Sequence, residues 1–131
     1  MPSNAVSLLQ DLISIPSVNP DNAPGTDQTG EEAMAKYVQA YLEPLGYKIT
    51  LVEIRPGRPN LIARAPGGQD RPRILLGPHL DTVGVSGMTI DPFDPELRGG
   101  RIYGRGASDT KGPMAAMLQA CLLYTSDAAD E

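Results

Sequence analysis

The sequence indicates a layered α/β domain. With 131 residues, of which 40% are hydrophobic, the chain is long enough for one small domain with its own core. Apolar residues recur at helical spacing near both ends of the chain, and β-like apolar runs fill its middle. The order helix, helix, strands, helix is typical of a layered α/β domain.

Residues 5–13 are expected to form the first helix. Val6, Leu9 and Ile13 share one helical face, with Leu8 and Leu12 beside it. Proline in a helix interior removes a hydrogen bond and clashes with the preceding turn, so the helix should end before Pro16. The stretch that follows, "SVNPDNAPGTDQ", has the composition of a polar loop.

Residues 29–45 are expected to form the second helix. Thr29 and Glu32 have the Thr-x-x-Glu spacing of a capping box, which would set the start of the helix. Gly46 is expected to end it, and Pro44 should weaken its last turn. The apolar residues at helical spacing are Met34, Tyr37, Val38, Tyr41, Leu42 and Leu45.

The middle of the chain is expected to form strands. "YKITLVEI" and "NLIARA" flank a turn at "RPGRP", and the short apolar run "RILLG", residues 73–77, predicts a buried strand. Residues 96–98 and 101–103 flank Gly99-Gly100, which suits a two-residue hairpin turn. From Thr110 the spacing becomes helical again, with Pro113 in the first turn and one apolar face made of Met114, Met117 and Leu118.

Composition and charge exclude several classes of function. The net charge is −5 and no run of basic residues interrupts it, so the electrostatic footprint of a nucleic-acid-binding protein is missing. The N-terminus has no basic start, and no stretch approaches the roughly 20 apolar residues of a membrane span. Cys121 is the only cysteine, so no internal disulfide is expected. A cytoplasmic protein is the expectation.

His79, the only histidine, follows the predicted strand at residues 73–77 and precedes Asp81 by two positions. Positions i and i+2 share one face of a strand, so the Asp81 carboxylate could orient the imidazole. Metal-bound histidines usually donate their second N–H in this way, and open α/β sheets place their sites at the carboxyl ends of strands. The alternative is a polar histidine in a turn, without a site.

A glycine-rich stretch, "YGRGASDTKG", ends in Asp109 just before the last predicted helix. The order of Thr110, Lys111 and Gly112 fails the P-loop pattern, and the stretch also fails the dinucleotide-binding pattern of three glycines. The remaining functional interpretation is a tight backbone turn, permitted by the glycines, that places the Asp109 carboxylate at the start of a helix. The alternative is an aspartate that only caps this helix.

Taken together, "LLGPHLDTV", "DPF" and "GRIYGRGASDTKG" resemble the zinc-dependent aminoacylase, acetylornithine deacetylase, succinyl-diaminopimelate desuccinylase and carboxypeptidase superfamily of metallopeptidases. Asp109 follows His79 by 30 positions, close to the family's separation. The resemblance runs over most of residues 5–120. It implies the N-terminal part of a mixed-sheet, helix-flanked, phosphorylase/hydrolase-like catalytic domain, here truncated.

The resemblance also implies roles for individual residues. His79 would be a ligand of one metal, Asp81 the catalytic carboxylate that orients it, and Asp109 the carboxylate that bridges two metals. The peptide bond after that aspartate is often cis in relatives, so Asp109–Thr110 is expected to be cis. Glycines in this block should shape the backbone, and Lys111 is expected to be a solvated lysine at a helix start.

The implied activity is cleavage of amide bonds in N-acyl amino acids or short peptides. Two Zn²⁺ ions lower the pKa of a bridging water and polarise the scissile carbonyl, and Co²⁺ or Mn²⁺ would also suit a His/carboxylate site. In the family the general-base glutamate and the remaining ligands follow the Asp109 block, so this chain should be inactive by itself. The pair Glu31-Glu32 precedes that block and is no substitute. The full-length parent is expected to form a homodimer through a lid domain.

Residues 121–131, "CLLYTSDAADE", resemble the translation of the transposase adapter used in short-read library preparation. We therefore expect residues 1–120 to be the enzyme part and residues 121–131 to be a non-native tail. Without this tail the net charge would be −2, because Asp127, Asp130 and Glu131 are removed. The alternative function is a complete, non-catalytic α/β binding or interaction module that retains the motif blocks for structure.

Overall fold

The computed structural model describes residues 4–22, 26–67, 70 and 72–129. These residues form three α-helices and two antiparallel hairpins, with 3₁₀ turns at η1 (Pro20–Asn22) and η2 (Glu43–Leu45). The helices are α1 (Ala5–Ser14), α2 (Glu32–Leu42) and α3 (Lys111–Ala129). The strands are β1 (Lys48–Arg55), β2 (Arg58–Arg64), β3 (Glu96–Arg98) and β4 (Arg101–Tyr103). This order confirms the mixed α/β class.

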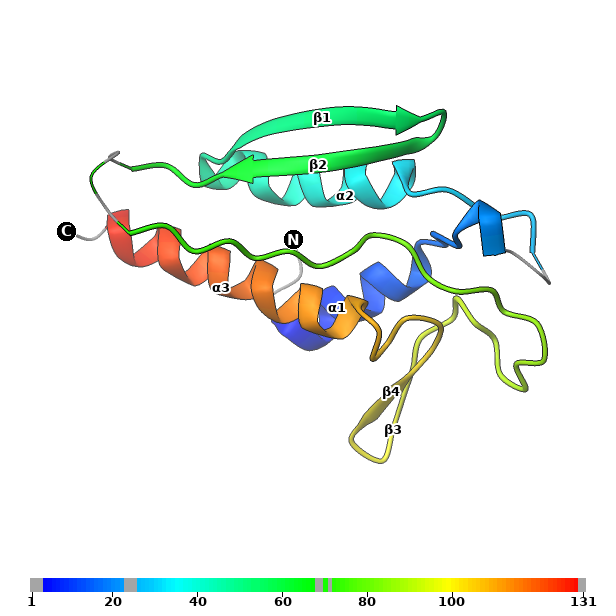
Figure 1. Cartoon of the computed structure of the whole chain (residues 1–131). Helices are drawn as coiled ribbons and strands as arrows, with labels where there is room; N and C mark the ends of the chain where they lie inside the picture. The colour runs from blue at the N-terminus through cyan, green and yellow to red at the C-terminus, as the bar shows by residue number, and fades with distance from the viewer. Residues whose placement is uncertain (1–3, 23–25, 68–69, 71, 130–131) are drawn as a thin grey trace.

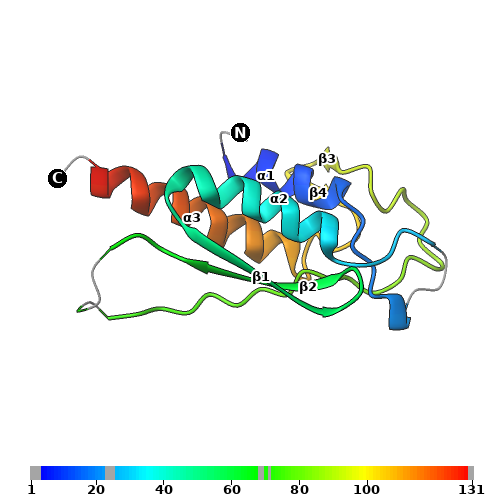
Figure 2. The same ribbon diagram turned by 90° about the horizontal axis from the view of Figure 1, so that it is seen from above.

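The hairpin β1–β2 lies over α2, and α1 and α3 pack against each other beneath it (Figures 1 and 2). The core forms where the three helices meet, because each helix turns its apolar side chains toward the other two. Burial of such side chains is the main favourable contribution to folding. The buried cluster consists of Leu8, Leu12, Met34, Val38, Tyr41, Leu42, Met114, Ala115 and Leu118.

Helix α1 begins and ends as its sequence predicts, but its buried face is rotated. The Asn4 side chain accepts hydrogen bonds from the first free N–H groups of the helix, and the helix stops at Ser14, before Pro16. Leu8 and Leu12, one turn apart, are fully buried, and so is Ile13 of the predicted face, whereas Val6 is 45% exposed. The side chain of Val6 points away because α3 covers only the side of α1 that carries Leu8 and Leu12.

The predicted capping box of α2 is wrong. The helix begins at Glu32, its N-cap is Glu31, and no side chain caps it. Thr29 instead forms a parallel bridge with Val18, and Gly30 follows with a φ of +93°. The Thr29 side chain is thereby held away from the first turn. Glu32, the other half of the expected box, forms an ion pair with Lys36.

Both predicted hairpins are present. Lys48 pairs with Arg64, and the two strands are joined by a tight turn at residues 56–57. Strands β3 and β4 flank Gly99-Gly100, and these glycines have φ angles of +58° and +74°. Two successive positive φ angles suit the type of turn that matches the twist of a hairpin.

The predicted buried strand at residues 73–77 is wrong for this structure. The segment is extended (Figure 1), but no described residue pairs with it as a strand. Ile74 is 87% exposed and Leu75 is 94% exposed. A strand needs the hydrogen bonds of a neighbour, and an apolar run identifies a strand only when that neighbour is in place. The described residues accordingly form two separate hairpins and not one mixed sheet.

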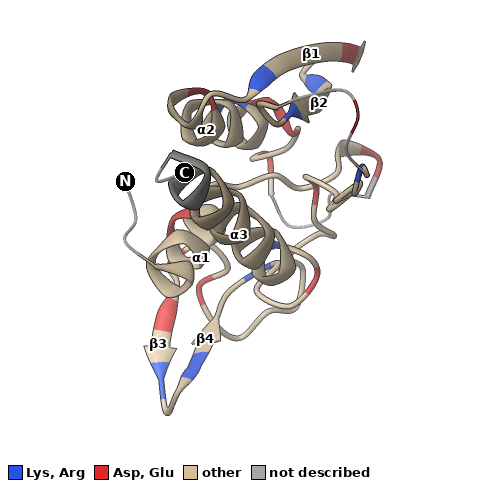
Figure 3. Ribbon diagram, turned by 90° about the vertical axis from the view of Figure 1, so that its left-hand side faces the viewer, with Lys and Arg blue, Asp and Glu red and all other residues tan. Residues whose placement is uncertain are grey.

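Helix α3 begins one residue after Thr110, and Pro113 lies in its first turn as expected. Met114 and Leu118 are buried, whereas Met117 is only partly buried. The helix continues without a break to Ala129, and Figure 3 shows that most of it carries no charged residue. Its geometry marks no boundary at residue 120, so the division into residues 1–120 and 121–131 stays a prediction. Within the described part of the chain, no helix has the length and apolar character to cross a membrane.

Candidate metal centre

Three loop segments lie side by side where the predicted site residues meet. Val18 forms parallel bridges with both Thr29 and Thr82. The Thr82 N–H donates to the Ser17 carbonyl at 2.9 Å, and the Asn19 N–H donates to the Thr82 carbonyl at 2.8 Å. The loop after α1 is therefore held against the segment that contains His79 and Asp81.

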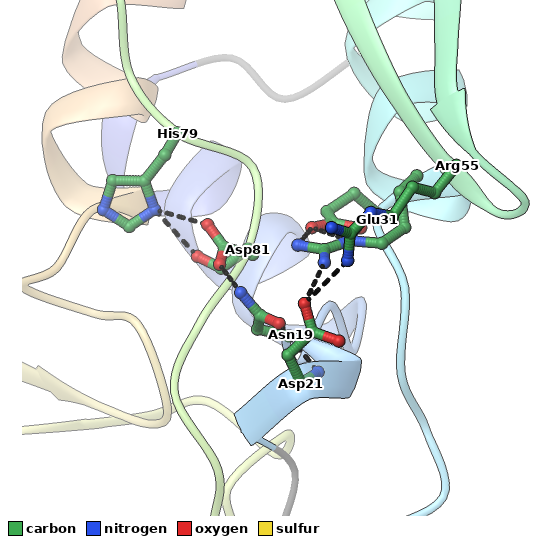
Figure 4. Close-up of polar contacts among 7 residues, drawn as sticks. Asn19, Asp21, Glu31, Arg55, His79 and Asp81 are labelled. Atoms are coloured by element: carbon green, nitrogen blue, oxygen red, sulfur yellow. Dashed lines mark hydrogen bonds and ion pairs between the residues drawn. The ribbon is translucent and has the colours of Figure 1, made fainter.

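The structure brings His79 and Asp81 together in the way the sequence suggests. The Nδ1 atom of His79 lies 3.0 Å from the Asp81 carbonyl oxygen and 3.1 Å from Asp81 Oδ1 (Figure 4). Both oxygens are acceptors, so Nδ1 carries a proton and donates it. When the imidazole is neutral, this arrangement leaves a lone pair on Nε2.

Asp109, 30 residues further along the chain, faces that second nitrogen. Its Oδ1 lies 2.9 Å from His79 Nε2, and its side chain is 86% exposed. The peptide bond between Asp109 and Thr110 is cis, as the resemblance implies. Because the carboxylate can only accept, this contact in the metal-free chain is a hydrogen bond from Nε2–H, and a bound metal would take the place of that proton. An imidazole nitrogen and a carboxylate oxygen thus converge at an open surface.

The pKa of His79 is raised above its ordinary value by these carboxylates. Partial burial of the ring acts to lower this pKa, but the hydrogen bond with Asp109 and the contacts with Asp81 outweigh it. Because metal ligation needs the neutral ring, a bound cation at Nε2 would compete with the proton for the same lone pair.

The glycines of the last block shape the backbone around Asp109, as expected. A methyl group on Gly106 would lie 2.8 Å from Thr82 Cγ2, and Gly106 has a φ of +82°. A methyl group on Gly112 would lie only 2.4 Å from the Ala107 carbonyl oxygen. The loop can therefore close tightly on the Thr82 segment and turn directly into α3.

Lys111 is a buried residue, and the prediction of a solvated lysine is wrong. Its side chain is 1% exposed, and Nζ donates to the Ile15 carbonyl at 2.7 Å. Burial lowers the pKa of Lys111 to about 8. The first residue of α3 points inward here because the Gly106 loop folds over it. The spacing of apolar residues along α3 does not predict the burial of Lys111, because the loop around Gly106 and not the helix face covers its side chain.

Asn19 is a residue of the site that sequence reasoning missed. Its side-chain amide donates to Asp81 Oδ2 at 2.9 Å, from 62 residues away. In the sequence it belongs to a polar loop with no recognisable spacing to the histidine. Glu31 forms an ion pair with Arg58 at 2.7 Å, a structural role that agrees with the expectation that it takes no part in catalysis.

The donors present suit part of a metal site. Imidazole nitrogen and carboxylate oxygen are ligands that Zn²⁺, Co²⁺ and Mn²⁺ accept. Within the described residues, no three side chains of His, Cys, Asp or Glu are grouped so that they could hold a metal ion. His79 and Asp109 therefore fit a metal as two of its ligands and do not complete its coordination.

Comparison with known proteins agrees with the motif blocks. The family model for peptidase family M20/M25/M40 matches residues 75–129. The succinyl-diaminopimelate desuccinylase of Methylobacterium radiotolerans is 37% identical over 129 residues, which cover 94% of this chain and 30% of that protein. The corresponding enzyme of Novosphingobium aromaticivorans is 38% identical over 128 residues, which cover 94% of this chain and 32% of that protein.

The fold has a counterpart among solved structures. The crystal structure of human carnosine dipeptidase 1 matches 93% of this chain with a TM-score of 0.71 and 24% sequence identity, and the match covers 28% of that protein. The chain thus spans about 30% of the length of the curated relatives that it resembles. The sequence matches and the motif blocks around His79 and Asp109 together support a fragment of a metallopeptidase of family M20/M25/M40.

Proposed function

We propose that this chain supplies His79 and Asp109 as ligands to the metal site of an amide hydrolase. The observation that carries the proposal is the arrangement of the imidazole, with Nδ1–H held by Asp81 and Nε2 turned toward the Asp109 carboxylate. Asp81 would orient His79 and raise its basicity as a ligand. Asp109 presents a carboxylate whose exposure leaves its second oxygen accessible.

The bound metal would be zinc, with cobalt or manganese as substitutes, and the family resemblance implies two ions at the site. Such ions activate a water molecule and polarise the scissile carbonyl when they are bound. The residues of this chain would contribute ligand orientation and a fixed tautomer of His79. Among the described residues, no three side chains of His, Cys, Asp or Glu are grouped to hold a metal ion. The family resemblance implies that the general base and the remaining ligands follow the Asp109 block, so we expect no hydrolysis by this chain alone.

The proposed substrates are N-acyl amino acids, with N-succinyl-diaminopimelate as the first candidate because two of the relatives are named for its hydrolysis. Short peptides are the second candidate class, since the structural neighbour is a dipeptidase. Homodimer formation through a lid domain and a cytoplasmic location stay predictions.

The test is an assay of the longest natural reading frame that contains this sequence. It should release succinate from N-succinyl-diaminopimelate with Zn²⁺ or Co²⁺ present. His79→Ala and Asp109→Ala should each lower kcat/KM by at least about 100-fold, because each removes a metal ligand. Glu96→Ala is the matched control, since it removes an exposed carboxylate from β3 and should leave kcat/KM unchanged.

Two results would overturn the proposal. The ligand assignment would be wrong if His79→Ala kept full activity. Complete absence of amide hydrolysis by the unmodified protein, with either metal and with acyl amino acids or dipeptides as substrate, would instead favour the non-catalytic binding module.

A further inference from the structure

The Asp81 carboxylate is held from two sides. Oδ1 accepts from His79 Nδ1 at 3.1 Å, and Oδ2 accepts from the Asn19 side-chain amide at 2.9 Å (Figure 4). A carboxylate with only one oxygen engaged can rotate about its terminal bond, because that torsion is broad. With both oxygens engaged, its plane is fixed relative to the imidazole.

Asn19 is itself fixed at three points. Its backbone N–H donates to the Thr82 carbonyl at 2.8 Å, and its side-chain Oδ1 accepts from the Asp21 N–H at 2.9 Å. Its Nδ2 donates to Asp81. The amide orientation follows from chemistry, because an ionised carboxylate cannot donate and a backbone N–H cannot accept.

The loop that carries Asn19 is anchored to the rest of the fold. The Asp21 carboxylate pairs with both Arg55 and Arg58 at 3.1 Å, and Arg58 also pairs with Glu31 at the start of α2 (Figure 4). These ion pairs join the loop to the β1–β2 turn and to α2. The position of Asn19 therefore depends on packed elements, and Asn19 can in turn hold Asp81.

We propose that Asn19 is a positioning residue for His79. By fixing the Asp81 carboxylate it keeps the proton of the neutral imidazole on Nδ1 and leaves Nε2 as the ligating atom toward Asp109. This inference rests on the proposed function only in naming His79 a metal ligand. The contact itself and its effect on the ring are properties of the chain without metal.

The test uses the fact that His79 is the only histidine of the chain. Long-range ¹H–¹⁵N NMR of the metal-free, 131-residue chain then gives the two ring nitrogens without ambiguity. The spectra are recorded above the pKa of His79, where the ring is neutral. Asp109 Oδ1 lies 2.9 Å from Nε2 and competes for the ring proton, so every variant in this experiment also carries Asp109→Ala. In this background the ring should be mainly the Nδ1–H tautomer, since the tautomer is set by the hydrogen bonds of the two ring nitrogens.

Asn19→Ala should lower the ratio of Nδ1–H to Nε2–H by roughly three- to tenfold, the effect of losing one hydrogen bond. Asn19→Ser serves as a second variant, because its hydroxyl can support the loop turn but is too short to replace the amide. It should give a similar decrease. Asp21→Ala is the matched control: it removes the ion pairs of the same loop but keeps the backbone N–H that donates to Asn19 and the hydrogen bond from the Asn19 N–H to Thr82, so it should lower the ratio less than Asn19→Ala does.

A double-mutant cycle identifies the route of the effect. In an Asp81→Ala background, Asn19→Ala should have no further effect on the tautomer ratio, because the carboxylate through which Asn19 acts is gone. An unchanged tautomer ratio in both Asn19 variants would overturn the proposal. So would an effect of Asn19→Ala on this ratio that is equal with and without Asp81. A decrease of the ratio in Asp21→Ala as large as in Asn19→Ala would overturn it as well. No metal or substrate enters this experiment, so its failure is distinguishable from failure of the proposed function.

Discussion

Burial of Lys111 predicts that the chain becomes more stable as the pH rises from 8 to 10. The lysine is 1% exposed, and its Nζ donates a hydrogen bond to the Ile15 carbonyl, which carries no opposing charge. Burial lowers its pKa from the ordinary 10.5 to about 8, because it penalises the charged form. In the unfolded chain the same lysine is solvated and keeps the ordinary pKa.

The sign follows from counting protons. Between pH 8 and 10 the unfolded chain holds the Lys111 proton and the folded chain releases it, so the free energy of unfolding rises with pH. The pKa difference corresponds to a gain of about 2 kcal/mol across this interval. Above pH 10 the trend should reverse. Burial and the hydrogen bond to Asp11 raise the pKa of Tyr37. Above pH 10 the folded chain therefore keeps the phenol proton that the unfolded chain loses, and the free energy of unfolding falls as the pH rises.

The assay is urea-induced unfolding of the wild type and of Lys111→Met at pH 8 and pH 10. Methionine keeps the length of the side chain without its proton, so the variant should lose the gain of about 2 kcal/mol. Lys36→Met is the control, because Lys36 is exposed, and it should behave as the wild type does. An equal gain in wild type and Lys111→Met would refute the argument.

Three further predictions concern packing and charge. Gly106→Ala should lower the free energy of unfolding by roughly 2–4 kcal/mol in a urea titration, because φ is positive and the new methyl group would be too close to Thr82. Gly99 also has a positive φ but has open space around it, so Gly99→Ala should lower this free energy by only about 1–2 kcal/mol. Equal losses in the two variants would contradict the contact with Thr82. Leu12→Ala should cost about 2–5 kcal/mol in urea unfolding, against under about 1 kcal/mol for the exposed Val6→Ala, and a similar cost for both would place the core elsewhere. Glu31→Gln should lower the Tm measured by calorimetry more than Glu32→Gln does, because Glu31 is buried beside Arg58, whereas Glu32 is exposed beside Lys36. The reverse order of the two Tm changes would count against the buried ion pair.

Features that depend on neighbouring residues were predictable from the sequence. The turn at Gly99-Gly100 and the end of α1 before Pro16 are confirmed because each is decided within a few residues. The cis bond after Asp109 is confirmed as well, although only the family resemblance suggested it. Pairing of His79 with Asp81 followed from their separation of two positions.

Features that depend on distant contacts were not predictable. Residues 73–77 have the apolar pattern of a buried strand, but pattern alone cannot supply the neighbour that makes a strand. The capping box failed because the bridge between Val18 and Thr29 places Thr29 elsewhere. Asn19 reaches Asp81 across 62 residues, and no local spacing records that contact.

The most direct test of the central claim is a Zn²⁺ titration of this chain, followed through the two ring nitrogens of His79. Millimolar Zn²⁺ should shift the Nε2 resonance and leave the proton on Nδ1, because Asp81 holds that side of the ring. Asp109→Ala should weaken this binding, since it removes the second donor, whereas Glu96→Ala should not. Coordination at Nδ1, or an Nε2 resonance that does not respond to zinc, would contradict the assignment of His79 and Asp109 as a pair of metal ligands.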